Sequence, residues 1–229
     1  MIEVKNLSKR FNFKQVLKDV SFTVKKNEIT CLIGVNGTGK STTMKTILGL
    51  VPFNKGDIVI DGVSIKEKRS GNISFVPDHL TMPLHLTIAE AFQFMKDYYS
   101  IWNQDRADEL LAYFKLNASQ KLNTLSRGNA AKVSLILGLS LNTDYILLDE
   151  PFLGIDLFAK EKIRELFSTH FLEGRGILLT THEIDEVEHL IDRVVILNDG
   201  VIAQDFYTET VRVEEGKSVI DKLREVQEG

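Results

Sequence analysis

The sequence has little cysteine: Cys31 is the single one among its 229 residues. One cysteine excludes an intramolecular disulfide and a cysteine-rich metal site, and it fits a reducing compartment. Long hydrophobic runs are also missing, since apolar stretches such as residues 133–141 fall short of the roughly 20 residues that a membrane-spanning helix needs. The opening residues, MIEVKNLSKRF, contain no long apolar stretch after their first charges and predict no secretory signal. We therefore expect a cytoplasmic protein that crosses no membrane by itself.

A strong excess of charge of either sign is missing as well. The 28 Lys and Arg residues nearly balance the 32 Asp and Glu residues, and the net charge is −4. Nucleic acid is therefore not expected as the main partner. With 43% apolar and 26% charged residues, the composition is that of an ordinary globular protein, long enough for a sizeable core and an inserted subdomain.

Apolar strands alternate with helices over much of the chain. Residues 29–33, 145–148 and 177–180 are apolar runs typical of buried strands. Helical patterns follow the second and third of these runs, at residues 156–171 and 183–191. This alternation predicts a mainly parallel sheet that is covered by helices on both faces.

The N-terminal part and the middle of the chain depart from this alternation. Apolar and polar residues alternate at positions 2–4 and 20–24, which predicts short strands with one solvated face. Residues 80–141 look mostly helical, and Thr87 with Glu90 forms a capping box at the start of one predicted helix. We interpret this middle stretch as a helical insertion into the α/β core.

A hairpin and a polar tail are expected near the C-terminus. Apolar residues at 194–197 and 201–203 flank Asn198-Asp199-Gly200, which is a strong hairpin signal. The tail from Tyr207 is polar and ends in a short amphipathic pattern over residues 219–226.

The most specific motif runs from Gly34 to Thr42 and reads GVNGTGKST. Its spacing is that of the P-loop, and it lies between a predicted strand and a predicted helix, which a plain glycine-rich turn need not do. Glycines let the backbone approach a polyphosphate closely, and the N-terminus of the next helix favours its negative charge. Lys40 is expected to reach the β- and γ-phosphates, and Ser41 to hold Mg²⁺. The residues of this loop that we expect to bind ATP are Gly34, Asn36, Gly37, Thr38, Gly39, Lys40, Ser41 and Thr42.

Two other predicted strands end in residues able to act on a bound phosphate. Asp149 and Glu150 follow the apolar run 145–148, and His182 follows the run 177–180. Ligands bind at the carboxyl edge of open α/β sheets, so we expect Asp149 to support the Mg²⁺ shell and Glu150 to polarise an attacking water as general base. Most lone histidines are ordinary hydrogen-bonding residues, but His182 ends a buried-looking strand. We expect it to contact the γ-phosphate and to hold the water and Glu150 in register.

Together these motifs resemble the nucleotide-binding subunit of ABC transporters. In that family a Leu-Ser-Gly-Gly-Gln signature stands upstream of the Asp-Glu strand, and Leu125-Ser-Arg-Gly-Asn129 stands there in this sequence. The resemblance implies that Ser126, Gly128 and Asn129 bind ATP that is held by a second subunit. An ordinary capped start of a helix is the alternative interpretation of this segment, with Ser126 as its cap.

Further positions match the family along nearly the whole chain. Leu153-Gly-Ile-Asp156 matches the D-loop and implies that Asp156 belongs to the ATP site, while His182 matches the switch histidine. Phe11 matches the aromatic residue that stacks on adenine. Core packing is the alternative role for Phe11, and Phe13 is a competing candidate.

The resemblance also implies a fold and a domain organisation. The fold is an α/β P-loop NTPase with a RecA-like core, an N-terminal antiparallel β-subdomain and an inserted α-helical subdomain. The ATP-binding core would comprise residues 1–78, which include the β-subdomain, and residues 141–206. The helical signature subdomain would span 79–140, and a C-terminal tail would span 207–229.

Two departures from the family pattern stand out. Arg127 replaces the first glycine of the signature and Asn129 replaces its glutamine. An arginine there either adds positive charge near the opposing phosphates or points to solvent. Asp78 takes the place of the Q-loop glutamine, where a carboxylate is still able to contact Mg²⁺ or a water.

The resemblance implies a motor that hydrolyses ATP to drive transport. Its cofactors would be ATP and Mg²⁺. Its partners would be a second ATPase subunit, in a homodimer around two ATP, and an integral-membrane permease docked near residues 78–91. It would then lie at the cytoplasmic face of the cell membrane.

The branch of the family is indicated by two segments. Residues 98–102 and 124–128 look similar to bacterial ABC-2-type exporters, which predicts export of a peptide, an antibiotic or a lipid-like substrate. Aromatic residues of a core or surface are an equally simple interpretation of 98–102, and import stays open. The alternatives in function are a non-transport ABC ATPase that acts as a regulatory or assembly module, and a P-loop kinase. The signature-like segment and His182 argue against the kinase.

Overall fold

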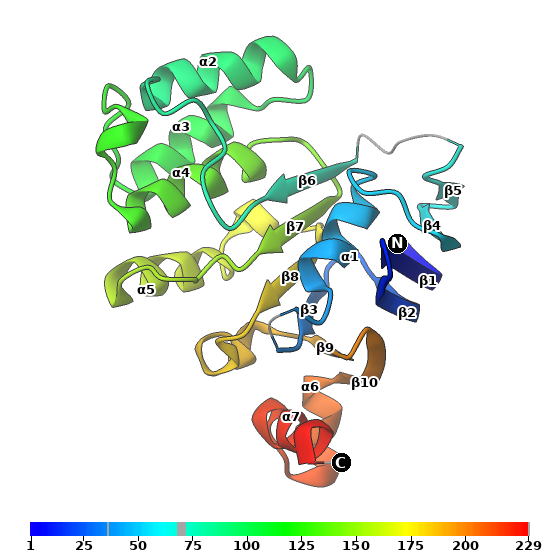
Figure 1. The fold of residues 1–229 in the computed structure, drawn as a ribbon. Helices are drawn as coiled ribbons and strands as arrows, with labels where there is room; N and C mark the ends of the chain where they lie inside the picture. The colour runs from blue at the N-terminus through cyan, green and yellow to red at the C-terminus, as the bar shows by residue number, and fades with distance from the viewer. Residues whose placement is uncertain (36, 68–71, 229) are drawn as a thin grey trace.

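The computed structural model describes residues 1–35, 37–67 and 72–228, apart from the side chain of Glu186. The larger of its two sheets has six strands (Figure 1). In chain order they are β3 (Ile29–Ile33), β6 (Ile73–Val76), β7 (Tyr145–Asp149), β8 (Gly176–Thr181), β9 (Arg193–Asn198) and β10 (Val201–Tyr207). Their order across the sheet is β10-β9-β3-β8-β7-β6, and only the pair β9 and β10 is antiparallel. The expected mainly parallel sheet is confirmed.

The central strands are apolar throughout because both faces of this sheet are covered. All five residues of β7 and all six of β8 are buried. Successive residues of a strand point to opposite faces. Ile146 and Leu148 accordingly pack among the residues of the helical part, and Tyr145 and Leu147 pack on the other side, together with α1 (Lys40–Ile47) and the smaller sheet.

The smaller sheet is antiparallel and lies beside α1 in Figure 1. Its strand order is β2-β1-β4-β5. The strands are β1 (Ile2–Phe11), β2 (Lys14–Val24), β4 (Lys55–Ile60) and β5 (Val63–Ser64). The inward residues of β1, β2 and β4 pack on Met44 and Ile47 of α1, which explains the alternation in the sequence. β1 and β2 extend over 10 and 11 residues and are longer than the short alternating segments predicted.

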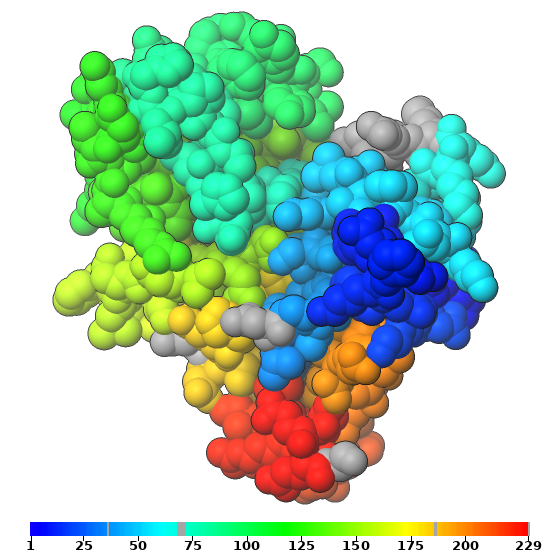
Figure 2. All heavy atoms as spheres, in the orientation of Figure 1, coloured from blue at the N-terminus to red at the C-terminus, as the bar shows by residue number. Residues whose placement is uncertain are grey.

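A group of helices stands at the β6 edge of the large sheet. It comprises α2 (Ile88–Tyr98), α3 (Gln104–Tyr113), the turn η1 (Leu122–Thr124) and α4 (Arg127–Leu139). At the start of α2, Thr87 Oγ1 accepts a hydrogen bond from Glu90 N at 3.2 Å, and Thr87 N donates to Glu90 Oε2 at 2.7 Å. The predicted capping box is therefore present. In Figure 2 these helices form a green group above the α5 segment and to one side of the blue N-terminal strands.

Two predicted helices are wrong in their extent or type. A helix was expected over 156–171, but α5 ends at Leu166 (Leu157–Leu166) and a 3-10 turn, η2 (His170–Leu172), follows. Leu166 O accepts from both Thr169 N at 3.0 Å and Thr169 Oγ1 at 2.6 Å, so the α-helical bonding gives way to 3-10 bonding at this point.

The helix expected over 183–191 is instead two 3-10 turns, η3 (Ile184–Glu186) and η4 (Glu188–Leu190). Val187 has φ −133° and interrupts them. Ile184 and Val187 are both buried, and the three-residue spacing between them is one that a 3-10 turn places on one side.

The C-terminal region begins with the predicted hairpin. Asp199 and Gly200 have φ of 44° and 79°, as a two-residue turn between twisted strands requires. After β10 come α6 (Thr208–Thr210), the π-helical turn η5 (Val211–Glu215) and α7 (Val219–Glu228). Val219 is buried, and Ile220, Leu223 and Val226 pack against the main core, so the predicted amphipathic helix is present. These segments protrude at the end of the molecule away from the α2–α4 group (Figure 1).

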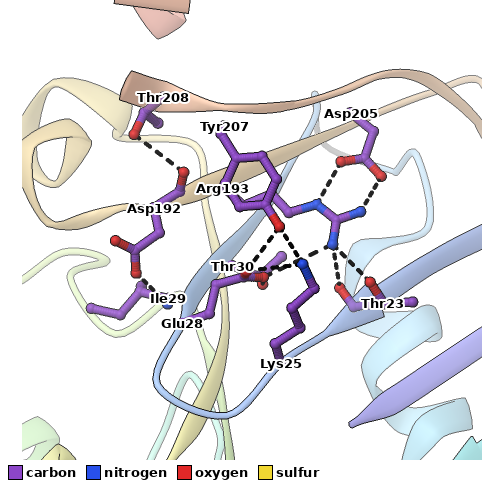
Figure 3. Close-up of polar contacts among 10 residues, drawn as sticks. All are labelled: Thr23, Lys25, Glu28, Ile29, Thr30, Asp192, Arg193, Asp205, Tyr207 and Thr208. Carbon is purple, nitrogen blue, oxygen red and sulfur yellow. Dashed lines mark hydrogen bonds and ion pairs between the residues drawn. The ribbon is translucent and has the colours of Figure 1, made fainter. Parts of the chain in front are cut away.

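A polar cluster joins β10 to the neighbouring strands (Figure 3). Arg193 donates from Nε and Nη2 to the two carboxylate oxygens of Asp205, at 2.7 and 2.6 Å. This hydrogen bonding raises the pKa of the guanidinium. Tyr207 Oη accepts from Lys25 Nζ at 2.5 Å and donates to Glu28 Oε2 at 3.1 Å. Arg193 Nη1 also donates to Thr23 Oγ1 of β2 at 2.7 Å, and Thr30 Oγ1 of β3 donates to Glu28 Oε1 at 3.0 Å. β2, β3, β9 and β10 are thus held together at the edge opposite the glycine-rich loop.

Removal of one charge from this cluster should destabilise the fold. We expect Asp205→Asn to lower the free energy of unfolding by about 1–3 kcal/mol, because the guanidinium of Arg193 loses an ionised partner at a mostly buried site. Urea unfolding measures this value. The matched control is Glu209→Gln, whose partner Arg212 is 74% exposed; it should change stability by less than about 0.5 kcal/mol. Equal effects of the two variants would contradict the role given to the cluster.

Candidate active site

The glycine-rich loop connects β3 to α1 at the carboxyl edge of the large sheet. Gly37 and Gly39 have φ of 85° and 114°, values that side chains disfavour. A Cβ at Gly34 would lie 2.2 Å from Leu197 O, and one at Gly39 would lie 2.6 Å from Leu17 Cδ2. The loop is therefore packed tightly against both β9 and β2. Asn36 lies outside the described residues.

Lys40 points back into this loop. Its side chain is 7% exposed, and Nζ donates to Gly34 O at 2.7 Å and lies 3.7 Å from Glu150 Oε1. A buried ammonium at the N-terminus of a helix is the arrangement that a polyphosphate requires. The local geometry thus fits the predicted role of the P-loop.

Ser41 and Asp149, predicted as Mg²⁺ ligands, are brought together. Ser41 Oγ donates to Asp149 Oδ1 at 3.3 Å, and Asp149 is only 4% exposed. A hydroxyl and a carboxylate are the oxygen ligands that Mg²⁺ prefers. In the described parts of the chain no cluster of three or more His, Cys, Asp or Glu residues would hold a metal alone. Phosphate oxygens and water would complete the shell.

Asp78, the third predicted metal ligand, lies near but apart from this pair. Its carboxylate contacts His79 Nδ1 at 2.6 Å and is 45% exposed. It lines the same hollow as Ser41 and Glu150. Asp78 thus faces the predicted nucleotide space from the segment after β6.

The two predicted catalytic residues contact each other. Glu150 Oε2 accepts from His182 N at 3.2 Å and lies 3.0 Å from His182 Nδ1. Glu150 has φ 49°, a strained value for a residue with a side chain, and strain of this kind gathers at functional sites. Its carboxylate lies between Lys40 and His182, at the end of β7, and the arrangement fits a positioned general base.

Thr180 is a site residue that the sequence analysis missed. Its Oγ1 donates to Asp149 Oδ1 at 2.6 Å and accepts from Glu150 N at 3.1 Å. Asp149 and Thr180 are direct neighbours in the parallel pairing of β7 and β8. A threonine at the polar end of an apolar strand was the available signal, but the register that places it beside Asp149 is not readable from the sequence.

The residues of the loop and of the two strand ends line one open hollow of about 390 Å³. Its lining is Val16, Gly37, Gly39, Lys40, Ser41, Thr42, Asp78, Glu150, Leu153 and His182. Phe11, predicted to stack on adenine, is 45% exposed and lies outside this lining, with Lys9 Nζ 4.5 Å from its ring centroid. Its competitor Phe13 is 94% exposed.

The signature-like segment is not part of this hollow. Ser126 caps α4, and its Oγ accepts from Asn129 N at 3.3 Å. Asp156 caps α5, where its Oδ1 accepts from Ala159 N at 3.0 Å. A Cβ at Gly128 would lie 3.0 Å from Asp156 Oδ2, so these predicted residues meet one another rather than Lys40. One chain therefore carries two separate groups of predicted ATP contacts.

A glycine-rich loop before α1 and an Asp-Glu pair at the end of β7 define a P-loop nucleoside triphosphatase. Comparison with known proteins is more specific. Residues 17–153 match the family described as ABC transporter. The chain belongs to this family, as the subunit that binds and hydrolyses ATP.

Relatives and solved structures agree with this assignment. The lipopolysaccharide export system ATP-binding protein LptB of Haemophilus influenzae is 32% identical over 213 residues, which are 88% of each chain. The linearmycin resistance ATP-binding protein LnrL of Bacillus subtilis is 34% identical over 208 residues, 87% of this chain and 67% of that protein.

Two solved structures show the same fold. The ATP-binding subunit of an ABC transporter superposes with a TM-score of 0.89 at 30% identity over 99% of both chains. A dimeric ATP-binding cassette in a post-hydrolysis state, bound to ADP and Pi, gives 0.79 at 26% identity over 90% of this chain and 98% of that one. The predicted ABC ATPase fold is confirmed. Every helix in the described part of the chain is too short or too polar to serve as a membrane span.

The hydroxyl of Thr180 should matter for the magnesium-dependent part of nucleotide binding. We expect Thr180→Val to raise the Mg²⁺ concentration that half-maximal ATP binding requires by about tenfold, because Asp149 loses the donor that orients it. Thr180→Ser keeps the hydroxyl and should stay close to the wild type. Titration of Mg²⁺ with a fluorescent ATP analogue measures the difference, and serine and valine variants that behave alike would contradict it.

Proposed function

We propose that this chain is the ATPase subunit of an exporter and drives a separate membrane permease. Two copies would close head to tail around two ATP, at the cytoplasmic face of the cell membrane. The proposed substrate is a peptide, an antibiotic or a lipid-like molecule, as the names of LptB and LnrL suggest. We retain the proposed division into a core (1–78 and 141–206), a helical part (79–140) and a tail (207–229).

One observation carries the proposal of a dimer. Lys40, Ser41 and Glu150 line one hollow, whereas Ser126, Gly128 and Asn129 lie at the start of α4, outside that lining. The start of α4 is the positive end of a 13-residue helix, and such an end favours a phosphate. A second copy would supply this end to each ATP. The dimeric solved cassette supports this arrangement.

The residues in the hollow have separate tasks in the proposed reaction. Lys40 would bind the β- and γ-phosphates, while Ser41 and Asp149 would hold Mg²⁺, with Asp78 facing them. Bound Mg²⁺ would offset the negative charge of the phosphates. Glu150 would accept a proton from the attacking water, and His182 would orient the carboxylate of Glu150 through their 3.0 Å contact.

The proposed permease site is an apolar groove between α2 and the core. It has a volume of about 590 Å³ and is lined by Leu50, Phe75, Leu80, Met82, Phe94 and Tyr99, among others. The rings of Phe94 and Tyr98 stack at 4.4 Å on the exposed side of α2. Figure 2 shows the segment after α1 beside the teal and green helical group, where this groove lies. A short apolar helix of a permease loop fits such a surface.

The first test concerns the proposed base. We expect Glu150→Gln to reduce steady ATP hydrolysis by roughly 10²–10⁴-fold, because the amide does not accept the proton, and to leave ATP binding intact. The variant should accumulate as an ATP-bound dimer, which size-exclusion chromatography detects. Lys40→Ala is the control and should lose nucleotide affinity instead. Normal hydrolysis by Glu150→Gln would exclude Glu150 as the base.

The second test concerns the groove. We expect Phe94→Glu to abolish copurification of the chain with a membrane permease and to leave the ATPase rate of the isolated chain unchanged. The control is Phe13→Glu, an equally large change at an exposed aromatic residue outside the groove. Affinity purification from solubilised membranes measures both. Copurification of no permease with the wild type would favour the non-transport ATPase, and retention by Phe94→Glu would exclude this docking surface.

A further inference from the structure

Arg127, which replaces the first glycine of the family signature, contacts Gly154 of its own chain. A Cβ at Gly154 would be 2.4 Å from both Cζ and Nη1 of Arg127 and 2.8 Å from Nη2. The guanidinium therefore occupies the space that a side chain at position 154 would need. Gly154 also has φ 64°, so its backbone conformation itself favours glycine, whatever the position of the guanidinium. This contact was foreseen by neither interpretation of Arg127 from the sequence.

The same two segments meet at a second point. A Cβ at Gly128 would lie 2.9 Å from the Cβ of Ala159 and 3.0 Å from Asp156 Oδ2. Glycine at position 128 therefore lets the start of α4 approach the start of α5 more closely than a residue with a Cβ would. Arg127 extends this contact onto the loop that precedes α5.

Arg127 and Gly154 are both exposed, so the guanidinium meets this glycine at the surface of the molecule and not in its packed interior. Among the described residues, Arg127 makes no ion pair and no side-chain hydrogen bond. It lines a cavity of about 280 Å³ together with Asp78, His79 and Glu150. The side chain thus lies between the start of α4 and the loop that follows the proposed base.

We propose that Arg127 is a positioning residue that holds the loop 153–156 to the start of α4 within one chain. The consequence for catalysis rests on the proposed head-to-tail dimer. In that dimer the start of α4 meets the γ-phosphate of the partner's ATP, while loop 153–156 follows this chain's own Glu150. Arg127 therefore transmits the state of one ATP site to the base of the other. Glycine at position 127 has no side chain with which to make this connection.

A double-mutant cycle tests the contact in the nucleotide-free chain. Gly154→Ala introduces backbone strain in any background, but only beside Arg127 must its new methyl group also displace a guanidinium. We expect Gly154→Ala to lower the midpoint of thermal unfolding by about 2–4 °C more in the wild type than in Arg127→Ala. Hydrogen exchange of the amides of residues 153–156 should also be faster in Arg127→Ala. If Gly154→Ala lowers the unfolding midpoint equally in the wild type and in Arg127→Ala, and hydrogen exchange of residues 153–156 is unchanged, the proposed contact is wrong.

ATP hydrolysis tests the transmission between sites. We expect Arg127→Gly to lower kcat severalfold and to bring the Hill coefficient for ATP from near 2 toward 1, with unchanged affinity of the isolated chain for ATP. Arg127→Lys keeps the charge but not the flat guanidinium, and should behave like Arg127→Gly. Full activity and cooperativity in Arg127→Lys would overturn the proposal in favour of a simple charge effect. If the wild type never dimerises, the proposed function fails. The double-mutant cycle still tests the contact between Arg127 and Gly154, because it is measured on the single chain.

Discussion

Close approach of backbone to backbone at the glycine-rich loop is the constraint on which the rest of the site depends. A Cβ at Gly34 would lie 2.2 Å from the carbonyl oxygen of Leu197, too near for any side chain, and one at Gly39 would lie 3.3 Å from Val16 O and 2.6 Å from the Leu17 side chain. Gly200 extends this packing, since a Cβ there would lie 2.4 Å from Val16 O. The loop is thus fixed between β9, β2 and the β9–β10 turn. Its rigid placement is what positions Lys40 opposite the ends of β7 and β8.

The charged groups around Lys40 form a series of contacts that a bound nucleotide would rearrange. Lys40 contacts Gly34 O and the carboxylate of Glu150, which in turn contacts His182. A γ-phosphate placed in the hollow would compete for Lys40 and release Glu150 toward water. Asp149 does not take part in this exchange, because Thr180 and Ser41 hold it from two sides. One acid stays fixed while the neighbouring acid is free to act, which matches their separate proposed roles.

Local signals in the sequence were sufficient for the main fold and for much of the site. The P-loop, the Asp-Glu pair and the capping box of α2 depend on adjacent residues, and the apolar runs of β3, β7 and β8 depend on burial of both sheet faces. Contacts between distant segments were not predictable. The helix expected over 183–191 is two 3-10 turns because Ile184 and Val187 must reach the core, and Thr180 and Gly154 matter only through partners supplied by the fold. The largest departure in the signature, Arg127, has a contact that no sequence pattern indicates.

Subunit complementation tests the central claim most directly, namely that each ATP site takes its loop from one copy and its helix end from the other. Lys40→Ala and Ser126→Ala chains would each be inactive alone, since every site in either homodimer carries a lesion. In a mixed dimer one site receives both lesions and the other receives none. The account predicts that mixing the two inactive proteins restores ATP hydrolysis. A mixture no more active than its separate components would contradict it.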